Sequence, residues 1–587
     1  MTNSHLISVQ PLAGSPSFAA ANGALSPDTR HAIDAALAQL QARKDAWVAL
    51  DVATRIELLD DIRRDLQAVA DDWVAACVQA KGIGPQQSFA HGEEWVFFAA
   101  VLRLARLLRQ SLADIRRMGR PGLPAPMRTR PNGQVSAPVL PQTTLDRLMF
   151  PFTTAEVWLP PGQSPEAVTA AQAAFYRQPP SRGTVALVLG AGNVSSLVPG
   201  DVLHALFVKE QVVALKPNPV NDYLGPLLER AFRALVRRGF LRIIYGGVAE
   251  GDYLCHHPAV DALHLTGSDK TFEAILFGPG PEGQRRKAAR QPRLSRPFTA
   301  ELGNVSPIIV VPGPWTAGDI RRQAGRIATW LVLNAGFNCL TPRVIIQAAN
   351  WPQREALNQA IAQALAQIGL RQAYYPGARQ RHSQFVAANH TARQVGRPTN
   401  GQLPWTYIPG VNPADTANPC FTSEAFCGLM AETALPAASP ADFVARAVAF
   451  ANQHLWGTLT ATLMLHPASA KTPEVSAAVE RALADLRYGT VLINQYGGYG
   501  YFLMTTPWGG YPGQDIFDIQ SGVGMVNNVL MFDRPQKAVV RSPFTLYPEP
   551  VRATARHFDR FGRKLAMLEQ SPALWRVPGL LWELARG

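Results

Sequence analysis

The sequence has few cysteines and no long apolar run. Its 587 residues include five cysteines, widely scattered and without a C-x-x-C pair. An odd, dispersed set is not typical of a disulfide scaffold or a zinc site, so we expect neither, and no other metal site. No apolar stretch is long enough to cross a bilayer, and the first 20 residues lack the pattern of a signal peptide. We therefore expect a reducing, cytoplasmic setting.

The positive charge is large but not concentrated. Lys and Arg number 56 against 43 Asp and Glu, which gives a net charge of +13. Basic residues gather loosely between Arg103 and Arg130 and between Arg285 and Arg296, without interleaved aromatic side chains. No nucleic-acid-binding motif accompanies them. We interpret the charge as solvated surface and expect no nucleic-acid partner.

The first third of the chain changes character twice. Residues 1–27 are rich in Ser, Pro, Ala and Gly, which predicts an irregular arm. Apolar residues then recur at helical spacing to about residue 117. Repeated prolines and glycines over residues 118–150 exclude a regular helix there. This segment is predicted to be a long loop or a strand-edged excursion.

From Thr184 onward, strands and helices alternate. Apolar runs typical of buried parallel strands end in polar or glycine residues, as Val185–Leu189 does before Gly190 to Asn193. Such units predict an α/β fold with open parallel sheets, whose ligands lie at the carboxyl ends of the strands. Further strands are predicted at 212–215, 241–245, 262–265, 307–311, 344–346, 486–493, 529–532 and 538–540. Residues 278–297 form a basic, Gly/Pro-rich insertion, and the tail from residue 550 is predicted to be helical.

Cys339 follows the end of an apolar run, in a small polar loop with Gly336 and Asn338. A structural cysteine more often lies inside such a run. A loop cysteine can present a thiolate, which is the nucleophilic form, to a ligand. One cysteine in such a loop does not define a site, so its partners must come from elsewhere in the chain.

Seven short motifs, in order, resemble those of the aldehyde dehydrogenase superfamily. They are the strand-end Asn193, Lys216-Pro217, Thr266-Gly267-Ser268, Glu301-Leu302-Gly303-Asn304-Val305-Ser306-Pro307, Asn334-Ala335-Gly336-Phe337-Asn338-Cys339, Glu424-Ala425-Phe426 and Pro507-Trp508-Gly509-Gly510. The resemblance covers roughly residues 30–541. It implies an aldehyde dehydrogenase-like fold with a Rossmann-type cofactor domain, an α/β catalytic domain and a small oligomerisation strand region.

The resemblance also implies domain boundaries. They are a cofactor-binding domain at 28–300 with a loop or oligomerisation excursion at 118–180, a catalytic domain at 301–510, a return to the cofactor domain with the oligomerisation strand at 511–541, and a C-terminal helical tail at 542–587. Departures from the family pattern, such as Phe337 in place of Gln, indicate a divergent member.

The resemblance assigns roles in the oxidation of an aldehyde. Cys339 is expected to form a thiohemiacetal, and the Asn193 amide and the Cys339 backbone N–H to hold the oxyanion. Glu301 is expected to activate the water that hydrolyses the thioester. Taken singly, Asn193 is better explained as a turn residue, Lys216 as a surface lysine and Glu301 as a solvated charge at a strand start.

NAD or NADP is the cofactor that the resemblance implies. Lys216 is expected to bind the adenosine ribose, and Glu424 the nicotinamide ribose. The remaining cofactor-binding candidates are Gly247, Gly251, Gly267, Ser268 and Phe426. Pro219 stands where NAD-preferring members usually carry Glu, whose carboxylate would repel a 2′-phosphate, so we expect NADP to be accepted or preferred.

Three functions remain open at this point. The first is NAD(P)-dependent oxidation of an aldehyde to the acid, which the presence of Glu301 favours. The second is a CoA-dependent acylating dehydrogenase or reductase, and the third is a catalytically silent scaffold of the same fold.

Aromatic residues near the motifs predict an apolar substrate, although several could equally pack the core. The expected tunnel residues are Trp330, Phe337, Tyr496, Tyr499, Tyr501 and Phe502, with Phe337 the first place to look for altered substrate choice. By resemblance, Val529 to Val540 should pair between subunits in a homodimer or larger oligomer. The basic amphipathic tail fits a membrane surface, but packing across a subunit interface is favoured because Pro572 and Pro578 interrupt it.

Overall fold

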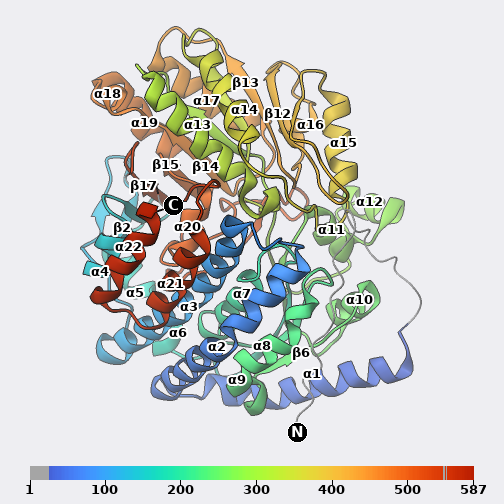
Figure 1. Cartoon of the computed structure of the whole chain (residues 1–587). Coiled ribbons are helices and arrows are strands. Elements are labelled where there is room, and N and C mark those ends of the chain that lie inside the picture. The colour runs from blue at the N-terminus through green and yellow to red at the C-terminus, as the bar shows by residue number, and fades with distance from the viewer. Residues whose placement is uncertain (1–24, 547–548, 550, 587) are drawn as a thin grey trace.

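The computed structural model describes residues 25–546, 549 and 551–586 (Figure 1). Most of the arm predicted for residues 1–27 lies outside the described residues. The fold is α/β, built on a six-stranded and an eleven-stranded sheet, both largely parallel. The helices are α1 (Pro27–Val48), α2 (Val52–Ala80), α3 (Ser88–Met118), α4 (Thr144–Met149), α5 (Pro165–Ala171), α6 (Ala174–Arg177), α7 (Leu197–Phe207), α8 (Gly225–Ala231), α9 (Arg233–Arg238), α10 (Val248–His256), α11 (Asp269–Phe277), α12 (Gly280–Ala288), α13 (Ala317–Val332), α14 (Arg354–Ala366), α15 (Ala378–Ala388), α16 (Pro419–Thr422), α17 (Pro440–His454), α18 (Pro467–Ala470), α19 (Pro473–Asp485), α20 (Gly497–Phe502), α21 (Phe558–Gln570) and α22 (Val577–Arg586).

The six-stranded sheet holds the first strand–helix series. Its order is β16 (Gly522–Val523), β8 (Phe298–Glu301), β7 (Ala262–Thr266), β4 (Thr184–Leu189), β5 (Gln211–Lys216) and β6 (Leu241–Ile243). All neighbours pair in parallel except β16 with β8. The internal strands β4 and β5 are each buried at five of six residues, which explains their Val- and Leu-rich runs.

The eleven-stranded sheet holds the second series. Its order is β1 (Arg128–Thr129), β2 (Val135–Leu140), β3 (Thr154–Trp158), β17 (Lys537–Arg541), β15 (Thr490–Ile493), β14 (Thr460–Met464), β9 (Ser306–Val310), β10 (Pro342–Ala348), β13 (Leu429–Leu435), β12 (Trp405–Val411) and β11 (Arg393–Val395). The strands from β17 to β12 pair in parallel, and the strands outside them pair antiparallel. The excursion after residue 118 therefore contributes β1 to β3.

Strand β17 is an internal strand of the large sheet. One edge pairs with β15 and the other with β3, both from the same chain. The prediction that this region pairs with a second subunit does not fit this arrangement, because no edge of β17 is free. That Val529 to Val540 contributes to a subunit contact in some other way stays a prediction.

Two other local predictions are wrong. Residues 529–532 form no strand; Asn527 and Met531 adopt positive φ there, which breaks an extended chain. The Gly/Tyr-rich segment after Ile493 contains the short helix α20 rather than only a loop. The basic insertion at 278–297, for which no secondary structure was predicted, contains helix α12.

The C-terminal tail is helical as predicted, and it packs on its own chain. Helix α21 lies against α3 (Figure 1). Gly92 and Gly562 permit the close approach, because a Cβ added to Gly562 would lie 2.5 Å from the carbonyl oxygen of Gly92. Buried Glu569 then pairs with Arg103 of α3 at 2.9 Å and with Arg106. One face of the tail thus packs within its own chain, and the predicted packing across a subunit interface stays a prediction.

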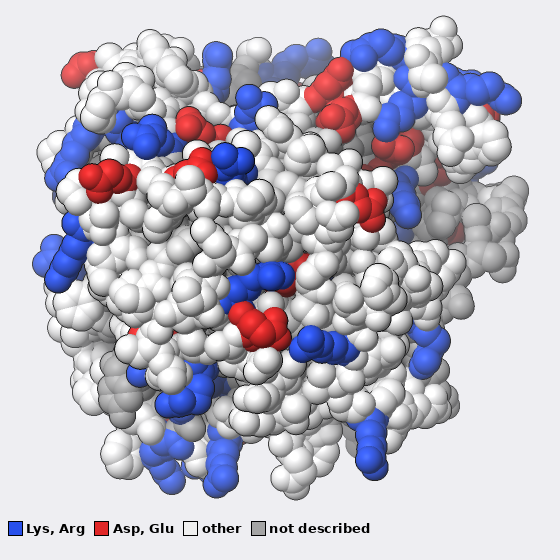
Figure 2. All heavy atoms as spheres, turned by 90° about the horizontal axis from the view of Figure 1, so that it is seen from above, with Lys and Arg blue, Asp and Glu red and all other residues white. Residues whose placement is uncertain are grey.

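The face of the molecule above the eleven-stranded sheet carries charges of both signs. Figure 2 shows Lys and Arg scattered toward the periphery of this face, with Asp and Glu among them and most of the surface uncharged. This agrees with the interpretation of the basic excess as solvated surface. Within the described part of the chain, no helix is both long and apolar enough to span a membrane.

Candidate active site

The predicted residues of the first series meet at one edge of the six-stranded sheet. In register, Leu189 of β4 lies opposite Lys216 of β5, and Thr266 of β7 opposite Glu301 of β8. Asn193 and Gly267 follow the ends of β4 and β7. Parallel pairing brings these carboxyl ends together, as the sequence predicted. Helix α13 and the short turn after it bring Cys339 to the same region from the other sheet's layer.

The loop before Cys339 has an unusual backbone. Asn334, Ala335 and Gly336 have φ values of 52°, 55° and 80°, three left-handed residues in succession. Gly336 is required, because a Cβ there would lie 2.5 Å from the carbonyl oxygen of Cys427. The left-handed conformation of Ala335 costs about 1 kcal/mol of backbone strain. Such strain persists only where surrounding contacts hold the backbone in place.

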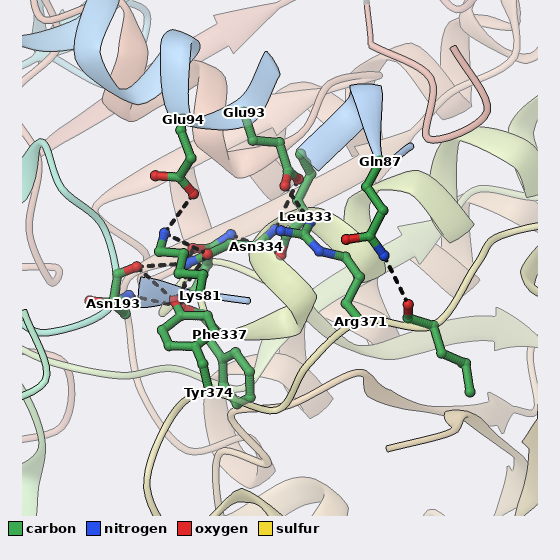
Figure 3. Close-up of polar contacts among 12 residues, drawn as sticks. Lys81, Gln87, Glu93, Glu94, Asn193, Leu333, Asn334, Phe337, Arg371 and Tyr374 are labelled. Atoms are coloured by element: carbon green, nitrogen blue, oxygen red, sulfur yellow. Dashed lines mark hydrogen bonds and ion pairs between the residues drawn. The ribbon is translucent and has the colours of Figure 1, made fainter. Parts of the chain in front are cut away.

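A buried polar network supplies those contacts (Figure 3). Lys81 forms an ion pair with Glu94 at 2.7 Å and donates to Asn334 Oδ1 at 3.0 Å. The Tyr374 hydroxyl lies 3.0 Å from the same oxygen and donates its single hydrogen to the nearer Asn193 carbonyl at 2.8 Å. The Asn334 side-chain amide donates to the Asn193 carbonyl at 2.9 Å. The network therefore ties the Cys339 loop to the end of β4.

The backbone of the loop is held by a second acid. Glu93 accepts the Asn334 N–H at 2.9 Å, and its other oxygen pairs with Arg371. Glu93 is buried, and desolvation raises the pKa of its carboxyl although Arg371 lowers it. Sequence reasoning missed Lys81, Glu93, Glu94, Arg371 and Tyr374. The available signal was the Glu93-Glu94 pair within the apolar helical run from Phe89 to Phe98.

The Glu301 carboxyl and the Cys339 thiol are close enough to influence each other's protonation, and Glu301 Oε1 is buried without a hydrogen-bond partner among the described residues. Burial raises the pKa of Glu301 to about 8, although its contacts with Cys339 and Trp508 lower it. Burial, and then the charges of Glu301 and Glu424, raises the pKa of the Cys339 thiol well above its usual value. A half-buried thiol near a carboxyl of high pKa is a pair between which a proton can pass.

Asn193 is buried and lies in the same cavity as Cys339. One of its side-chain amide hydrogens is donated to the Phe337 carbonyl at 2.8 Å. Because a primary amide carries two N–H donors, one remains for another acceptor. The position of this amide is fixed by the network described above, because Asn334 and Tyr374 both donate to its backbone carbonyl.

An apolar cavity of about 180 Å³ opens at Cys339. Its polar lining residues are few and include Glu93, Asn193, Asn338 and Gln495. Its aromatic and aliphatic walls include Trp330, Leu333, Tyr496, Tyr499, Tyr501, Phe502 and Trp508 near the thiol, and Phe558, Phe561, Leu565, Leu581 and Leu584 from the C-terminal helices. Five of the six predicted tunnel residues thus line it.

Phe337 is the exception. Its ring does not line the cavity but packs on the other side of the loop, 5.0 Å from Tyr374 and 5.9 Å from Phe426 between ring centroids. The prediction that Phe337 is the first determinant of substrate choice is therefore wrong in this structure. Its place is taken by the helices α21 and α22, which the sequence did not connect with the site.

Lys216 lies beside the glycines predicted to bind the same ligand. It is buried, burial lowers the pKa of its ammonium, and its only described hydrogen bond is a long one of 3.5 Å to the Pro217 carbonyl. A Cβ added to Gly251 would lie 3.5 Å from Lys216 Cε. Gly247 precedes α10 and is exposed, as is Pro219 after β5. A buried lysine with so few partners is suited to bind hydroxyl groups at this edge.

Ser268 caps helix α11, where its hydroxyl accepts the Thr271 N–H at 3.2 Å. Gly267 and Ser268 are both exposed at this helix N-terminus, which favours an anion. Asp269 in the first turn adds a negative charge and opposes that preference, although burial raises the pKa of its carboxyl.

Glu424 supplies the carboxylate of the Glu424-Ala425-Phe426 motif. It is partly buried, 3.9 Å from the Arg343 guanidinium, and its Oε1 accepts no hydrogen bond from the described residues. Burial raises the pKa of Glu424 to about 7, against the lowering effect of Arg343 and Arg381. Phe426 lies next to it, with a φ of 43°. The unfilled acceptor at Glu424 fits a ligand hydroxyl.

Comparisons with known proteins agree with this geometry. A sequence profile described as the aldehyde dehydrogenase family matches residues 160–386. An N-succinylglutamate 5-semialdehyde dehydrogenase of Sphingopyxis alaskensis is 32% identical over 161 residues, which cover 27% of this chain and 30% of that protein. The chain thus matches about a third of the length of such curated relatives.

The fold matches solved structures over most of its length. An aldehyde dehydrogenase of Pseudomonas syringae, solved with NAD+ and octanal, has a TM-score of 0.59 and 16% identity, covering 92% of this chain and 94% of that one. An NADP-dependent glyceraldehyde-3-phosphate dehydrogenase of Bacillus halodurans, solved with NADP, has a TM-score of 0.58 and 16% identity, covering 88% and 92%. At such identity the likeness shows the fold alone.

Proposed function

Because the chain belongs to the aldehyde dehydrogenase superfamily, we propose that it oxidises an apolar aldehyde to the carboxylic acid with NAD or NADP. The observation that carries the proposal is that Cys339 and Asn193 line one apolar cavity, and that the Glu301 carboxyl is near enough to raise the pKa of the Cys339 thiol. A nucleophile, a base and a space for the substrate meet there.

Cys339 acts as the nucleophile. Its thiol is protonated at neutral pH because its pKa is raised, so attack requires a base. Glu301 takes the thiol proton as the sulfur bonds to the aldehyde carbon. The carbonyl π electrons move to the oxygen, which becomes an oxyanion in the thiohemiacetal.

Asn193 stabilises that oxyanion with its free amide N–H, together with the backbone N–H of Cys339. An oxyanion donor of this kind contributes about 3–4 kcal/mol to transition-state stabilisation. The contribution depends on donors that do not have to reorganise, and the contacts from Asn334 and Tyr374 keep Asn193 in place.

The residues at the sheet edge fit a dinucleotide. Lys216 offers a nearly unpartnered ammonium, Gly251 leaves room beside it, and Glu424 offers an unfilled carboxylate oxygen. Lys216 would hold the adenosine ribose, Gly267 and Ser268 the diphosphate, and Glu424 the nicotinamide ribose, with Phe426 beside it. When bound, NAD or NADP supplies the hydride acceptor. The neutral Pro219 leaves room for a 2′-phosphate, so NADP is accepted.

Glu301 then acts a second time, on water. After losing the first proton to solvent, its carboxylate removes a proton from the water that attacks the thioester, and the acid leaves Cys339. A base held beside the nucleophile favours transfer of the acyl group to water over transfer to CoA. The cavity walls favour an aliphatic or aromatic aldehyde over a charged one.

Purified protein incubated with octanal and with NAD or NADP tests the proposal. Formation of reduced cofactor and octanoic acid without CoA is expected, and Cys339→Ala should abolish both. Cys420→Ala is the control, because Cys420 is buried away from the cavity beside Asn389. Strict dependence on CoA, or turnover by Cys339→Ala, would contradict the proposal.

A further inference from the structure

The C-terminal helices form a wall of the cavity and also part of the protein surface. Phe558, Phe561 and Leu565 of α21 and Leu584 of α22 line the cavity from inside. Leu581 of α22 lines it as well, yet its side chain remains 39% exposed. The cavity therefore reaches the surface beside α22.

The outer face of this region is apolar. In the part of the chain that the structure describes, ten large hydrophobic residues are exposed, and five lie between residues 567 and 582. Trp575 and Trp582 are 74% and 60% exposed. Leu148 and Phe152 are also exposed, and they flank Met149 and Phe150, which line the same cavity. Such clustering marks an interaction surface rather than chance exposure.

The charges on this face are of one sign. Arg576 lies over the Trp575 ring at 4.6 Å, and Arg586 over the Trp582 ring at 5.7 Å. Among the described tail residues no Asp or Glu is fully exposed, because Glu569 and Glu583 are buried and paired with Arg103 and Lys564. Of the fully exposed arginines of the tail, Arg586 lies on α22, whereas Arg552, Arg556, Arg560 and Arg563 lie before or on α21, where Arg563 pairs with exposed Asp71 of α2.

We propose that this docking face, made of α22, the turn before it and the exposed residues around α4, binds the surface of an anionic lipid bilayer. Tryptophan and arginine side by side are suited to the interface, where the ring enters the acyl boundary and the guanidinium meets phosphate. A second copy of the chain would place like charges against each other, which disfavours self-association through this face.

Docking places the opening beside Leu581 against the acyl region. If the proposed function holds, an apolar aldehyde dissolved in the bilayer reaches Cys339 without crossing water. This part of the inference rests on the proposed function, whereas binding to vesicles does not.

Flotation with vesicles tests binding without any use of catalysis. The full chain is expected to bind phosphatidylcholine vesicles that contain phosphatidylglycerol, and to bind vesicles of phosphatidylcholine alone much more weakly. Trp575→Ala/Trp582→Ala should weaken binding on the order of tenfold, because two interfacial rings are lost. Arg576→Gln/Arg586→Gln should weaken binding to the anionic vesicles by roughly fivefold per arginine.

Met118→Ala is the matched control, because Met118 is exposed at the end of α3 and lies outside the docking face. It should bind as the unaltered chain does. Brominated lipids should quench fluorescence from the unaltered chain and not from the double tryptophan variant. With short, water-soluble aldehydes, the tryptophan variant should turn over normally.

Three results would overturn the inference. They are absence of binding to anionic vesicles, equal binding by the tryptophan and Met118 variants, and a dimer that dissociates in the tryptophan variant without lipid. Vesicle binding without aldehyde oxidation would contradict the proposed function and leave docking intact. Normal oxidation without vesicle binding would do the reverse.

Discussion

The two sides of Cys339 differ in polarity. On one side, Lys81, Glu94 and Asn334 form a buried network of charges and amides. On the other side, aromatic rings and the helices α21 and α22 enclose an apolar cavity. Buried charges are costly unless paired, and their geometry is correspondingly specific. The polar side therefore fixes the geometry of the nucleophile. Apolar walls tolerate substitution, so the apolar side sets substrate choice.

The largest effect is expected where the two sides meet. Cys339→Ala should lower kcat by about 10⁴-fold or more, because the covalent step is lost. Stopped-flow measurement of reduced cofactor with saturating octanal gives the rate, and circular dichroism verifies the fold. Turnover within tenfold of the unaltered enzyme would show that another group is the nucleophile.

Loss of the base should be next in size. Glu301→Gln should lower kcat by about 10²–10⁴-fold. The enzyme with Glu301 should gain activity as the pH rises through about 8, because the carboxyl is protonated below that pKa and serves as a base only above it. A pH profile of kcat measures this, and the rising limb should vanish in the variant. A limb that persists in Glu301→Gln belongs to another group.

Substitutions on the polar side of Cys339 are expected to lower the stability of the fold. Lys81→Met leaves Glu94 buried without its cation, which should lower the free energy of unfolding by about 3–5 kcal/mol. Because Asn334 also loses a donor, kcat should fall more than KM rises. Urea unfolding and steady-state kinetics measure the two effects.

Lys81→Met/Glu94→Leu is the matched control for that experiment. Removal of both charges should restore most of the lost stability, since no unpaired ion remains. It should not restore kcat, because the contact with Asn334 is still missing. If Lys81→Met alone is as stable and as active as the unaltered chain, the network does not hold the Cys339 loop.

The apolar side should change selectivity with a smaller cost. Phe502→Ala enlarges the cavity and should raise KM for octanal by roughly tenfold, with little change for acetaldehyde. Phe337→Leu is the control, because Phe337 packs on Tyr374 outside the cavity. If Phe337→Leu shifts chain-length preference and Phe502→Ala does not, the assignment of the two sides is wrong.

Sequence patterns predicted what is local and repeated. Val185–Leu189 and Val212–Leu215 could be recognised as buried parallel strands, because both faces of such strands are apolar. Their order then placed Asn193, Lys216 and Glu301 at one sheet edge. Asn527 and Met531 illustrate the limit, since a positive φ has no apolar signature.

Contacts between distant segments could not be predicted in the same way. Lys81 and Asn334 are 253 residues apart, and no periodicity links them. The direction of the Phe337 side chain depends on three left-handed residues before it, which the sequence does not reveal. The pairing of β17 with β3, and the contribution of α21 and α22 to the cavity, likewise depend on tertiary packing.

Mass spectrometry of Glu301→Gln mixed with octanal and NAD or NADP is the most direct test of the central claim. The variant lacks the group that takes the thiol proton as well as the one that activates water, so the mixture is prepared at a pH high enough to ionise the Cys339 thiol without Glu301. Acylation then proceeds while water activation stays impaired, and an octanoyl thioester should accumulate on the peptide that contains Cys339, from which hydroxylamine should release it. Absence of any acyl adduct while reduced cofactor forms, or an adduct on a different cysteine, would contradict the account.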